Sequence, residues 1–248
     1  VIVSPLILTR WNQSPMYNDL CPYDSAKNER TVTGCVATAM AQVLKYWDYP
    51  VTGNGDYSYK HTLGTQFADF GATKYDWANM PLELTATSTD AQVAAVAQLM
   101  YHCGVSVEMD YGVAATGGSG AFTISSKSNT THCAEYALRE YWGYKPTLQG
   151  LQKAHYNDAD WKKMLKDDLK AGRPIIYSGY GDGGHCFVCD GYNEDEYFHF
   201  NWGWGGMYDG YFLLNALAPG TGGTGSGSGS YNNDQQAIFG LEPMRSID

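Results

Sequence analysis

A cysteine, a histidine and an asparagine have the types and the order along this chain that nucleophilic catalysis requires. Cys35 follows a glycine near the start, His185 follows two glycines far downstream, and Asn201 precedes a Trp-Gly-Trp-Gly-Gly run. Acyl transfer by a cysteine needs a thiolate, an imidazole within hydrogen-bond reach and a group that orients the imidazole ring. These residue types therefore point to hydrolysis of a carbonyl compound by a thiol.

The residues after Cys35 predict that its thiol lies at the start of a helix. Apolar side chains recur with helical spacing at Val36, Met40, Val43, Leu44 and Trp47. At a helix start, unpaired N–H groups and the positive end of the helix dipole lower the pKa of a thiol. We therefore expect the pKa of Cys35 to be lowered and its thiolate to be available as a nucleophile.

His185 and Asn201 are predicted to meet across a pair of strands. His185 begins one predicted strand and Asn201 ends the next, so the two can be neighbours across a hairpin. We expect the Asn201 amide oxygen to accept a hydrogen bond from one imidazole nitrogen, which would leave the other nitrogen facing Cys35. Gly183 and Gly184 would let a substrate backbone approach this strand.

The elements that must position these residues divide into a helical part and a strand part. Helical patterns cover 35–47, 89–104, 131–142 and 158–172, with Gly104 as an expected C-cap and Asp158 as an expected N-cap. Short strands are expected at 174–178, 185–189, 197–201, 211–215 and 237–241. This order predicts an α+β fold rather than a parallel βαβ sheet. We expect a helix-rich lobe over 30–172 and a β-rich lobe over 173–248.

Composition excludes some classes of protein. The chain has 248 residues and 44% hydrophobic content, which is enough for a substantial core. A net charge of −10 disfavours nucleic acid as a partner, because phosphate binding needs a concentrated positive surface. No stretch approaches the ~20 apolar residues of a membrane span. The chain begins with Val1 and not Met, so we expect an N-terminal segment to have been removed, by maturation or by trimming.

Six cysteines leave a second chemistry open. If Cys35 is free, at least one of the other five is also unpaired, and their connectivity is not readable from the sequence. Cys186 and Cys189 form a C-x-x-C pair that could serve a redox reaction or a zinc site, with His185 and His199 nearby. The pair lies in a strand pattern, however, and no second C-x-x-C follows. Strand alternation places Cys186 on the face opposite His185, where we expect a structural role.

Four segments of the chain resemble the streptopain family of secreted bacterial cysteine proteases. They are Thr33–Tyr46, Met109–Gly112, Gly183–Val188 and Asn201–Gly206, and the similarity runs from Asn12-Gln13 to the C-terminal strand. His185 also follows Cys35 at the ~130–150-residue spacing of papain-like enzymes. The resemblance implies one two-lobed papain-like catalytic domain over 1–248, with the N-terminal segment crossing between the lobes. It also implies a secreted, cell-surface or periplasmic endopeptidase made as a zymogen, inhibited by its own N-terminal pro-domain until maturation.

The resemblance assigns roles to particular residues. Cys35 matches the nucleophile, His185 the general base and acid, and Gln13 the oxyanion-hole glutamine that acts with the Cys35 N–H. Trp202, beside Asn201, matches the tryptophan that shields the Cys–His pair from water, while Trp204 is given a packing role.

Substrate contacts follow from the same resemblance. Gly184 and Ser119 match residues that contact substrate, and hydrophobic side chains are favoured two residues before the cut. The Gly/Ser-rich loop over 219–230 corresponds to a mobile flap beside the cleft.

The sequence therefore predicts a cysteine endopeptidase that acts on proteins or peptides and needs no metal or organic cofactor. Two alternatives stay open. One is a catalytically silent papain-like binding module, and the other is a zinc or redox protein that uses the Cys186–Cys189 pair.

Overall fold

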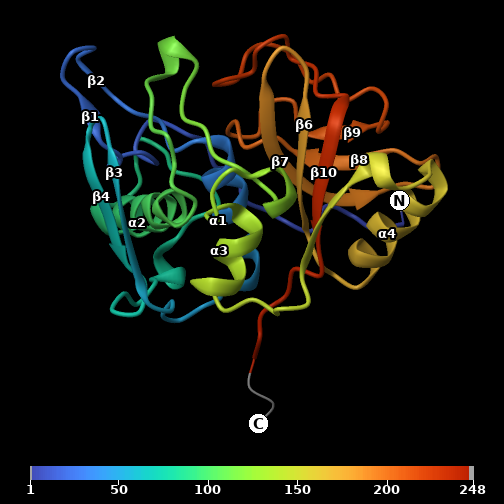
Figure 1. The fold of residues 1–248 in the computed structure, drawn as a ribbon, viewed down its shortest axis with the longest axis horizontal. Helices are drawn as coiled ribbons and strands as arrows, with labels where there is room; N and C mark the ends of the chain where they lie inside the picture. Colours follow the sequence, from blue (N-terminus) through green and yellow to red (C-terminus); the bar gives the residue numbers. More distant parts are fainter. Residues whose placement is uncertain (1, 246–248) are drawn as a thin grey trace.

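Three of the four α-helices gather on one side of the molecule, and a twisted antiparallel sheet lies with the fourth on the other, in a computed structural model that describes residues 2–245 (Figure 1). The helices are α1 (Cys35–Trp47), α2 (Asp90–Ser106), α3 (Ala134–Glu140) and α4 (Asp158–Lys170), with 3₁₀ turns η1 (Trp77–Asn79), η2 (Ala114–Thr116), η3 (Ser125–Lys127) and η4 (Lys153–His155). The strands are β1 (Tyr23–Asp24), β2 (Glu29–Arg30), β3 (Asp56–His61), β4 (Gly64–Asp69), β5 (Gln149–Gln152), β6 (Ile175–Tyr180), β7 (Gly184–Tyr192), β8 (Phe198–Asn201), β9 (Gly210–Phe212) and β10 (Asn233–Phe239).

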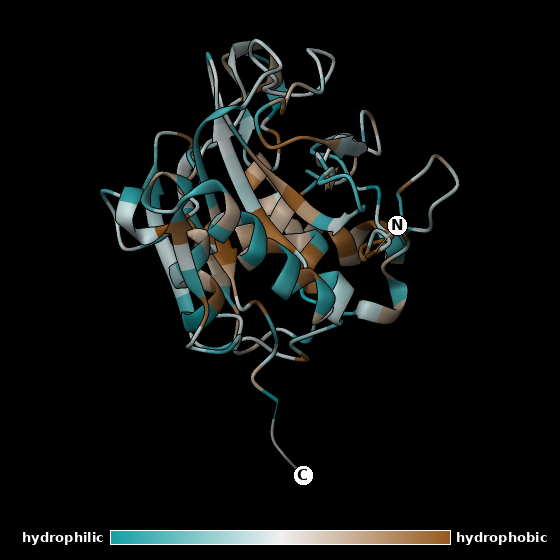
Figure 2. Ribbon diagram, turned by 90° about the vertical axis from the view of Figure 1, so that its right-hand side faces the viewer, coloured by the Kyte–Doolittle hydropathy of each residue, from teal (hydrophilic) through white to brown (hydrophobic). Residues whose placement is uncertain are grey.

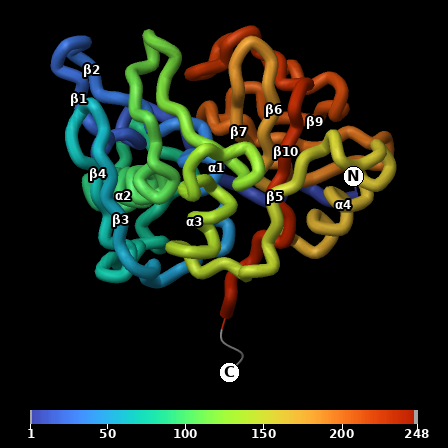
Figure 3. The backbone as a smooth tube through the Cα atoms, viewed as in Figure 1, coloured from blue at the N-terminus to red at the C-terminus, as the bar shows by residue number. Residues whose placement is uncertain are grey.

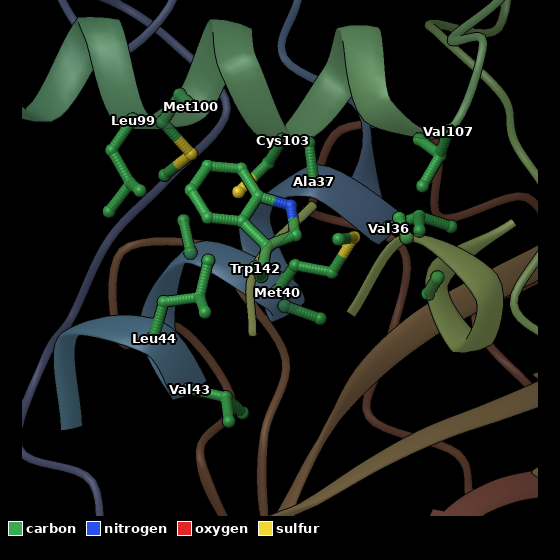
Figure 4. Close-up of a cluster of buried hydrophobic side chains, with 14 of the residues drawn as sticks. Val36, Ala37, Met40, Val43, Leu44, Leu99, Met100, Cys103, Val107 and Trp142 are labelled. Carbon is green, nitrogen blue, oxygen red and sulfur yellow. The ribbon is translucent and has the colours of Figure 1, made fainter. Parts of the chain in front are cut away.

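Helix α1 has the predicted bounds and is the buried axis of the helical side. Its residues from Val36 to Leu44 are all buried, because helices, strands and the N-terminal segment surround it. Its apolar side chains pack against α2 and Trp142 (Figure 4). The helix ends at Asp48, which adopts a left-handed conformation. The predicted helix is therefore confirmed, and its N-terminal residue is Cys35.

The other helices differ from expectation at their ends. Helix α2 begins with a capping box of Thr89 and Gln92 and continues past Gly104 to Ser106. The expected C-cap at Gly104 is therefore wrong. A Cβ atom there would lie 2.1 Å from the Tyr111 hydroxyl, so close packing explains the glycine.

Helices α3 and α4 are shorter than the patterns predicted. Helix α3 covers only Ala134–Glu140, with Cys133 at its N-cap position. Helix α4 is capped by Asn157, whose side chain accepts from the Asp160 N–H at 2.8 Å, so the expected cap at Asp158 is wrong by one residue.

A six-stranded antiparallel sheet in the order β5-β10-β6-β7-β8-β9 forms the other side. The α+β fold class is thus confirmed. The small β1–β2 hairpin and strand β5 were not predicted as strands, whereas the β3–β4 hairpin lies between Thr52 and Leu84, where the pattern predicts loop and short strand. Strand β5 follows turn-like sequence and acquires its hydrogen bonds only by pairing with β10, far away along the chain.

Strand alternation gives this sheet two buried faces, and its central strands contain hydrophobic segments, drawn brown in Figure 2. Ile176 and Val188 pack with α1 in one hydrophobic cluster, whereas Tyr177 and Phe187 pack with α4 in a second. Helix α4 therefore lies with the sheet, although the sequence grouped it with the helical lobe. The boundary between the two clusters falls before α4, because its Trp161 and Leu165 pack against the sheet.

The N-terminal segment connects the two sides (Figure 3). Val3 pairs with Tyr192 at the sheet, and the Leu6 N–H donates to the Asp190 carbonyl at 2.9 Å. The Trp11 N–H then donates to the Gln42 side chain on α1 at 3.3 Å. Within residues 2–245, no helix is long and apolar enough to cross a membrane.

Candidate active site

Cys35 is the first residue of α1, and its position depends on the glycine before it. Gly34 has φ of +89° and ψ of 145°, a backbone conformation that favours glycine. A Cβ atom at Gly34 would lie 2.5 Å from the Met109 sulfur. The Thr38 hydroxyl donates to the Gly34 carbonyl at 2.9 Å. Gly34 thus lets the chain turn sharply into the helix and leaves the Cys35 side chain at its open end.

His185 lies at the start of β7 and has one defined hydrogen-bond partner. Its Nε2 atom lies 2.8 Å from the Trp202 carbonyl oxygen. A carbonyl oxygen only accepts, so Nε2 carries a proton and Nδ1 is left as the acceptor of the neutral ring. Cys35 and His185 line the same cavity of about 290 Å³. The structure therefore brings the two residues together from the helix and the sheet.

Asn201 is close to this pair but does not touch the imidazole, so the expected contact is wrong. It pairs with Val188 in the β7–β8 register, and paired residues share a face of the sheet. His185, three positions from Val188, belongs to the opposite face. The Asn201 side chain instead donates to the Thr9 carbonyl at 2.9 Å and accepts from the Gln42 amide at 3.1 Å.

A single peptide group links Asn201 to His185. The Asn201 Oδ1 atom also accepts from the Gly203 N–H at 3.0 Å. That N–H belongs to the same peptide unit as the Trp202 carbonyl, which accepts from His185 Nε2. Hydrogen bonds at both ends of one amide polarise each other. Asn201 can therefore orient the His185 ring through the peptide between Trp202 and Gly203.

The tryptophan next to the imidazole is Trp204, not Trp202. The Trp204 ring stacks on His185 with centroids 4.4 Å apart and planes 16° apart, whereas the Trp202 centroid is 6.3 Å away. Trp202 is fully buried, and its indole N–H donates to the Tyr208 carbonyl at 3.1 Å. Trp204 therefore occupies the position beside the imidazole that was expected for Trp202. Trp202 contacts His185 through its backbone carbonyl instead.

Gln13 lies beside Cys35 and His185 at the start of α1. Its Oε1 atom accepts from the Gly34 N–H at 3.1 Å, which fixes the amide beside the start of α1. The Nε2 end remains a donor at a small cavity that Gln13 lines with Cys35 and His185. A preorganised N–H donor beside a nucleophile is the arrangement that stabilises a developing oxyanion.

Ser119 and Gly184 both line the cavity but differ in what they offer it. The Ser119 hydroxyl donates to the Val32 carbonyl at 2.8 Å and accepts from the Gly112 N–H at 3.0 Å, so it braces its own loop. A Cβ atom at Gly184 would lie 2.5 Å from the Tyr180 ring. Gly184 therefore lets the Tyr180 ring pack closely against the backbone beside His185.

The glycine-rich loop over 219–230 reaches the site. Thr224 and Gly225 line the small cavity with Cys35 and His185. The Trp204 indole N–H donates to the Thr224 carbonyl at 3.1 Å. The same tryptophan thus contacts the imidazole with its ring and the loop with its nitrogen.

Burial opposes an isolated charge on either reacting group. It raises the pKa of the Cys35 thiol, while hydrogen bonds from backbone groups of Cys186, Val36 and Cys35 itself lower it. The expected net lowering by the helix start is therefore wrong for the thiol alone. Burial lowers the pKa of His185 to about 4, against the hydrogen bond to Trp202, which raises it. Burial therefore favours the neutral thiol and the neutral imidazole.

Gln42 supports the site, although its role was not predicted from the sequence. It is fully buried on α1 and accepts from the Thr9 hydroxyl at 2.8 Å while it donates to Asn201. This amide joins the helix that carries Cys35 to the end of β8. A glutamine among apolar positions, two turns after Cys35 and on the same helix face, was the available signal.

The C-x-x-C pair does not form a dithiol site. All six cysteines are free thiols. Cys186 packs in the cluster around α1 and Cys189 in the cluster around α4, so their side chains leave opposite faces of β7. They cannot bind one metal or form a disulfide together. Cys186 has the expected orientation, yet it also lines the cavity beside Cys35.

A thiol and an imidazole that enter one cavity from a helix and from a sheet are the reacting pair of papain-like cysteine peptidases. The model of the peptidase C10 family matches residues 11–212. The chain belongs to this family.

Named relatives agree with this assignment. The chain is 39% identical over 242 residues to the thiol protease/hemagglutinin PrtT of Porphyromonas gingivalis, covering 94% of this chain and 26% of that protein. It is 34% identical over 252 residues to streptopain of Streptococcus pyogenes, covering 94% of this chain and 60% of streptopain. The chain thus spans about a quarter of the length of PrtT and about three-fifths of the length of streptopain.

Solved structures show the same fold. Active wild-type interpain A cysteine protease of Prevotella intermedia superposes with a TM-score of 0.84 at 40% identity, covering 96% of this chain and 94% of that one. A prointerpain A fragment superposes with a TM-score of 0.81 at 38% identity, covering 98% and 73%. The two-lobed papain-like fold is therefore confirmed.

Proposed function

We propose that this chain is a cysteine endopeptidase that hydrolyses peptide bonds in proteins. The observation that carries the proposal is the cavity shared by Cys35 and His185, with Nε2 of His185 committed to the Trp202 carbonyl. That commitment leaves Nδ1 as the nitrogen that takes the thiol proton. A buried pair of this kind forms a thiolate and an imidazolium in one step.

The reaction then follows from the positions of the donors. The Cys35 proton moves to His185, and the sulfur forms a bond to the scissile carbonyl carbon. The resulting oxyanion accepts hydrogen bonds from the Gln13 amide and the Cys35 N–H. The C–N bond breaks as the imidazolium protonates the leaving amine. Water, deprotonated by His185, hydrolyses the thioester and restores the thiol.

We also propose how the substrate binds. An extended peptide would pass Gly184 and the loop that holds Ser119, with a hydrophobic side chain two residues before the cut placed in the cavity. Val36 and Ala121 supply apolar lining for that side chain. The loop over 219–230 would act as a flap, and its contact with Trp204 supports this proposal.

A precursor form and secretion complete the proposal. We propose that an N-terminal pro-domain inhibits the enzyme before maturation, because a prointerpain A fragment shares this fold. Secretion is proposed from the resemblance to the streptopain family. N-terminal sequencing of the protein isolated from culture medium and from cells would test both.

The test of the proposed activity is cleavage of casein with reductant, before and after iodoacetamide, with mass spectrometry to locate the alkylated residue. We expect cleavage that is lost when Cys35 is alkylated. Absence of cleavage in folded, reduced protein would contradict the proposal and favour a silent binding module. Zinc found by elemental analysis in stoichiometric amount would instead favour the metal alternative.

A further inference from the structure

Asp209 lies at the end of the segment 202–209, which begins with Trp202, the residue whose carbonyl accepts from His185. It is the last residue before β9, and its Oδ1 atom accepts from the Trp202 N–H at 3.0 Å. The neighbouring Tyr208 carbonyl accepts from the Trp202 indole at 3.1 Å. The segment from Trp202 to Asp209 is therefore held at its two ends, by backbone and by side chain.

The residue that Asp209 holds is the one that contacts His185. Trp202 donates its N–H to Asp209 and offers its carbonyl to His185 Nε2 at 2.8 Å. The next peptide N–H, at Gly203, is held by Asn201. The two peptide groups that flank the Trp202 Cα are thus each fixed by one side chain, and Asp209 is the only one of these two side chains that can carry a charge.

Charged groups from three other parts of the chain surround Asp209. His199 on β8 and Arg10 in the N-terminal segment favour its ionised form, and Asp190 on β7 opposes it. His199 is itself bonded to Asp190, at 2.6 Å. Burial raises the pKa of Asp209 to about 6, so this carboxyl changes charge in a range where peptidases are assayed.

We propose that Asp209 is a positioning residue for the peptidase reaction, whose carboxylate fixes the Trp202 backbone and stabilises the imidazolium form of His185 through it. The proposal rests on the proposed function. The negative charge lies on the far side of the residue that accepts from Nε2–H, so it favours a positive ring. It acts without touching substrate, because Trp202 lies between.

Two variants separate the hydrogen bond from the charge. Asp209→Asn keeps an oxygen that accepts from Trp202, whereas Asp209→Ala removes the acceptor as well. We expect Asp209→Ala to lower kcat by about 10- to 100-fold with little change in KM, because one hydrogen bond to a charged group is lost. We expect Asp209→Asn, which has no charge at any pH, to lower kcat above pH 6 by less than Asp209→Ala does and to lose the decline of kcat near pH 6. Asp195→Asn, in an exposed turn, is the matched control.

A second readout keeps this test separate from the proposed function. The rate of Cys35 alkylation by iodoacetamide reports the thiolate and needs no peptide cleavage. We expect a step near pH 6 in the wild-type alkylation rate that is absent in Asp209→Asn. Two results would overturn the role of Asp209. One is that kcat and the Cys35 alkylation rate depend on pH in Asp209→Asn as they do in wild type. The other is that Asp209→Ala leaves kcat unchanged. If wild-type protein cleaves nothing, the proposed function fails, and the alkylation profile still decides whether Asp209 acts on the pair.

Discussion

Cys35 is the first residue of a buried helix, whereas His185 lies near the start of an interior sheet strand and is held by loop backbone and an indole ring. On the cysteine side, one glycine and one helix determine the position of the thiol. On the histidine side, the Trp202 carbonyl, the Trp204 ring and a glycine-rich loop determine the position of the imidazole. The thiol is thus placed by local sequence and the imidazole by contacts between distant segments.

The two sides should respond differently to substitution. A buried helix moves little, so the thiol offers a fixed reference point. The imidazole depends on several hydrogen bonds in series, and each can be weakened without unfolding the sheet. Substitutions on the histidine side should therefore give graded losses of activity, while loss of Cys35 should give an all-or-none result.

The largest expected effect is that of Cys35→Ala. We expect turnover to fall by about 10,000-fold or more, because no other thiol can replace the proposed nucleophile. The fold should remain intact, since the side chain is not part of the fully buried core, and circular dichroism checks this. Full activity in the folded variant would show that Cys35 is not the nucleophile.

His185→Ala should cost nearly as much. We expect a loss of about 100- to 10,000-fold in kcat, the range for a positioned acid–base group. Circular dichroism of wild type and variant controls for misfolding. Retention of more than a tenth of wild-type kcat would assign the proton transfer to another group.

Asn201→Ala should cost less than His185→Ala. Asn201 acts through the Trp202–Gly203 peptide, so orientation is weakened while the proton carrier stays. We expect a loss of about 10-fold in kcat, equivalent to one hydrogen bond. Gln42→Ala is the comparison variant, because it frees the Asn201 amide without removing it, and it should lose less. A loss equal to that of His185→Ala would show that Asn201 has a more direct role than this geometry gives it.

Trp204 tests the coupling between the imidazole and the flap. Trp204→Phe keeps a ring to stack on His185 but removes the N–H that donates to Thr224. We expect kcat to fall by a few-fold at most and KM to rise, because the loop loses its attachment. The change in KM is measured with a short peptide and with casein. Unchanged constants for both substrates would show that the flap does not depend on Trp204.

The smallest expected effect is on stability in acid. Burial lowers the pKa of His102 to about 4, so the folded chain keeps this ring neutral while the unfolded chain protonates it near pH 6.5. The unfolded state then binds more protons, and stability falls as pH decreases from about 6.5 to about 4. Urea unfolding of wild type and His102→Asn at pH 7 and pH 5 measures this. Equal pH dependence in both proteins would contradict it.

The sequence predicted those parts of the site that local structure determines. The start of α1 at Cys35 follows from a glycine and a helical apolar pattern, both contained in a short segment. The sheet strands around His185 were likewise visible as short apolar runs. The strand bounds differ by a few residues, because their ends depend on pairing partners.

The contacts around His185 could not be predicted in the same way. Asn201 was expected opposite His185, but the register places it opposite Val188, on the other face of the strand. A register is set by packing on both faces of the sheet and is not contained in either strand alone. Trp204 and Trp202 are likewise equivalent by residue type, and only the turn after β8 decides which ring meets the imidazole.

The most direct test of this account is the pH dependence of Cys35 alkylation in wild type and in His185→Ala. The central claim is that the helix and the sheet bring the thiol and the imidazole into one ion pair. It predicts that wild-type Cys35 reacts rapidly well below pH 8.5, the pKa of a free thiol, and that His185→Ala reacts only above it. Identical profiles in the two proteins would contradict the claim, because the thiol would then ionise without the imidazole.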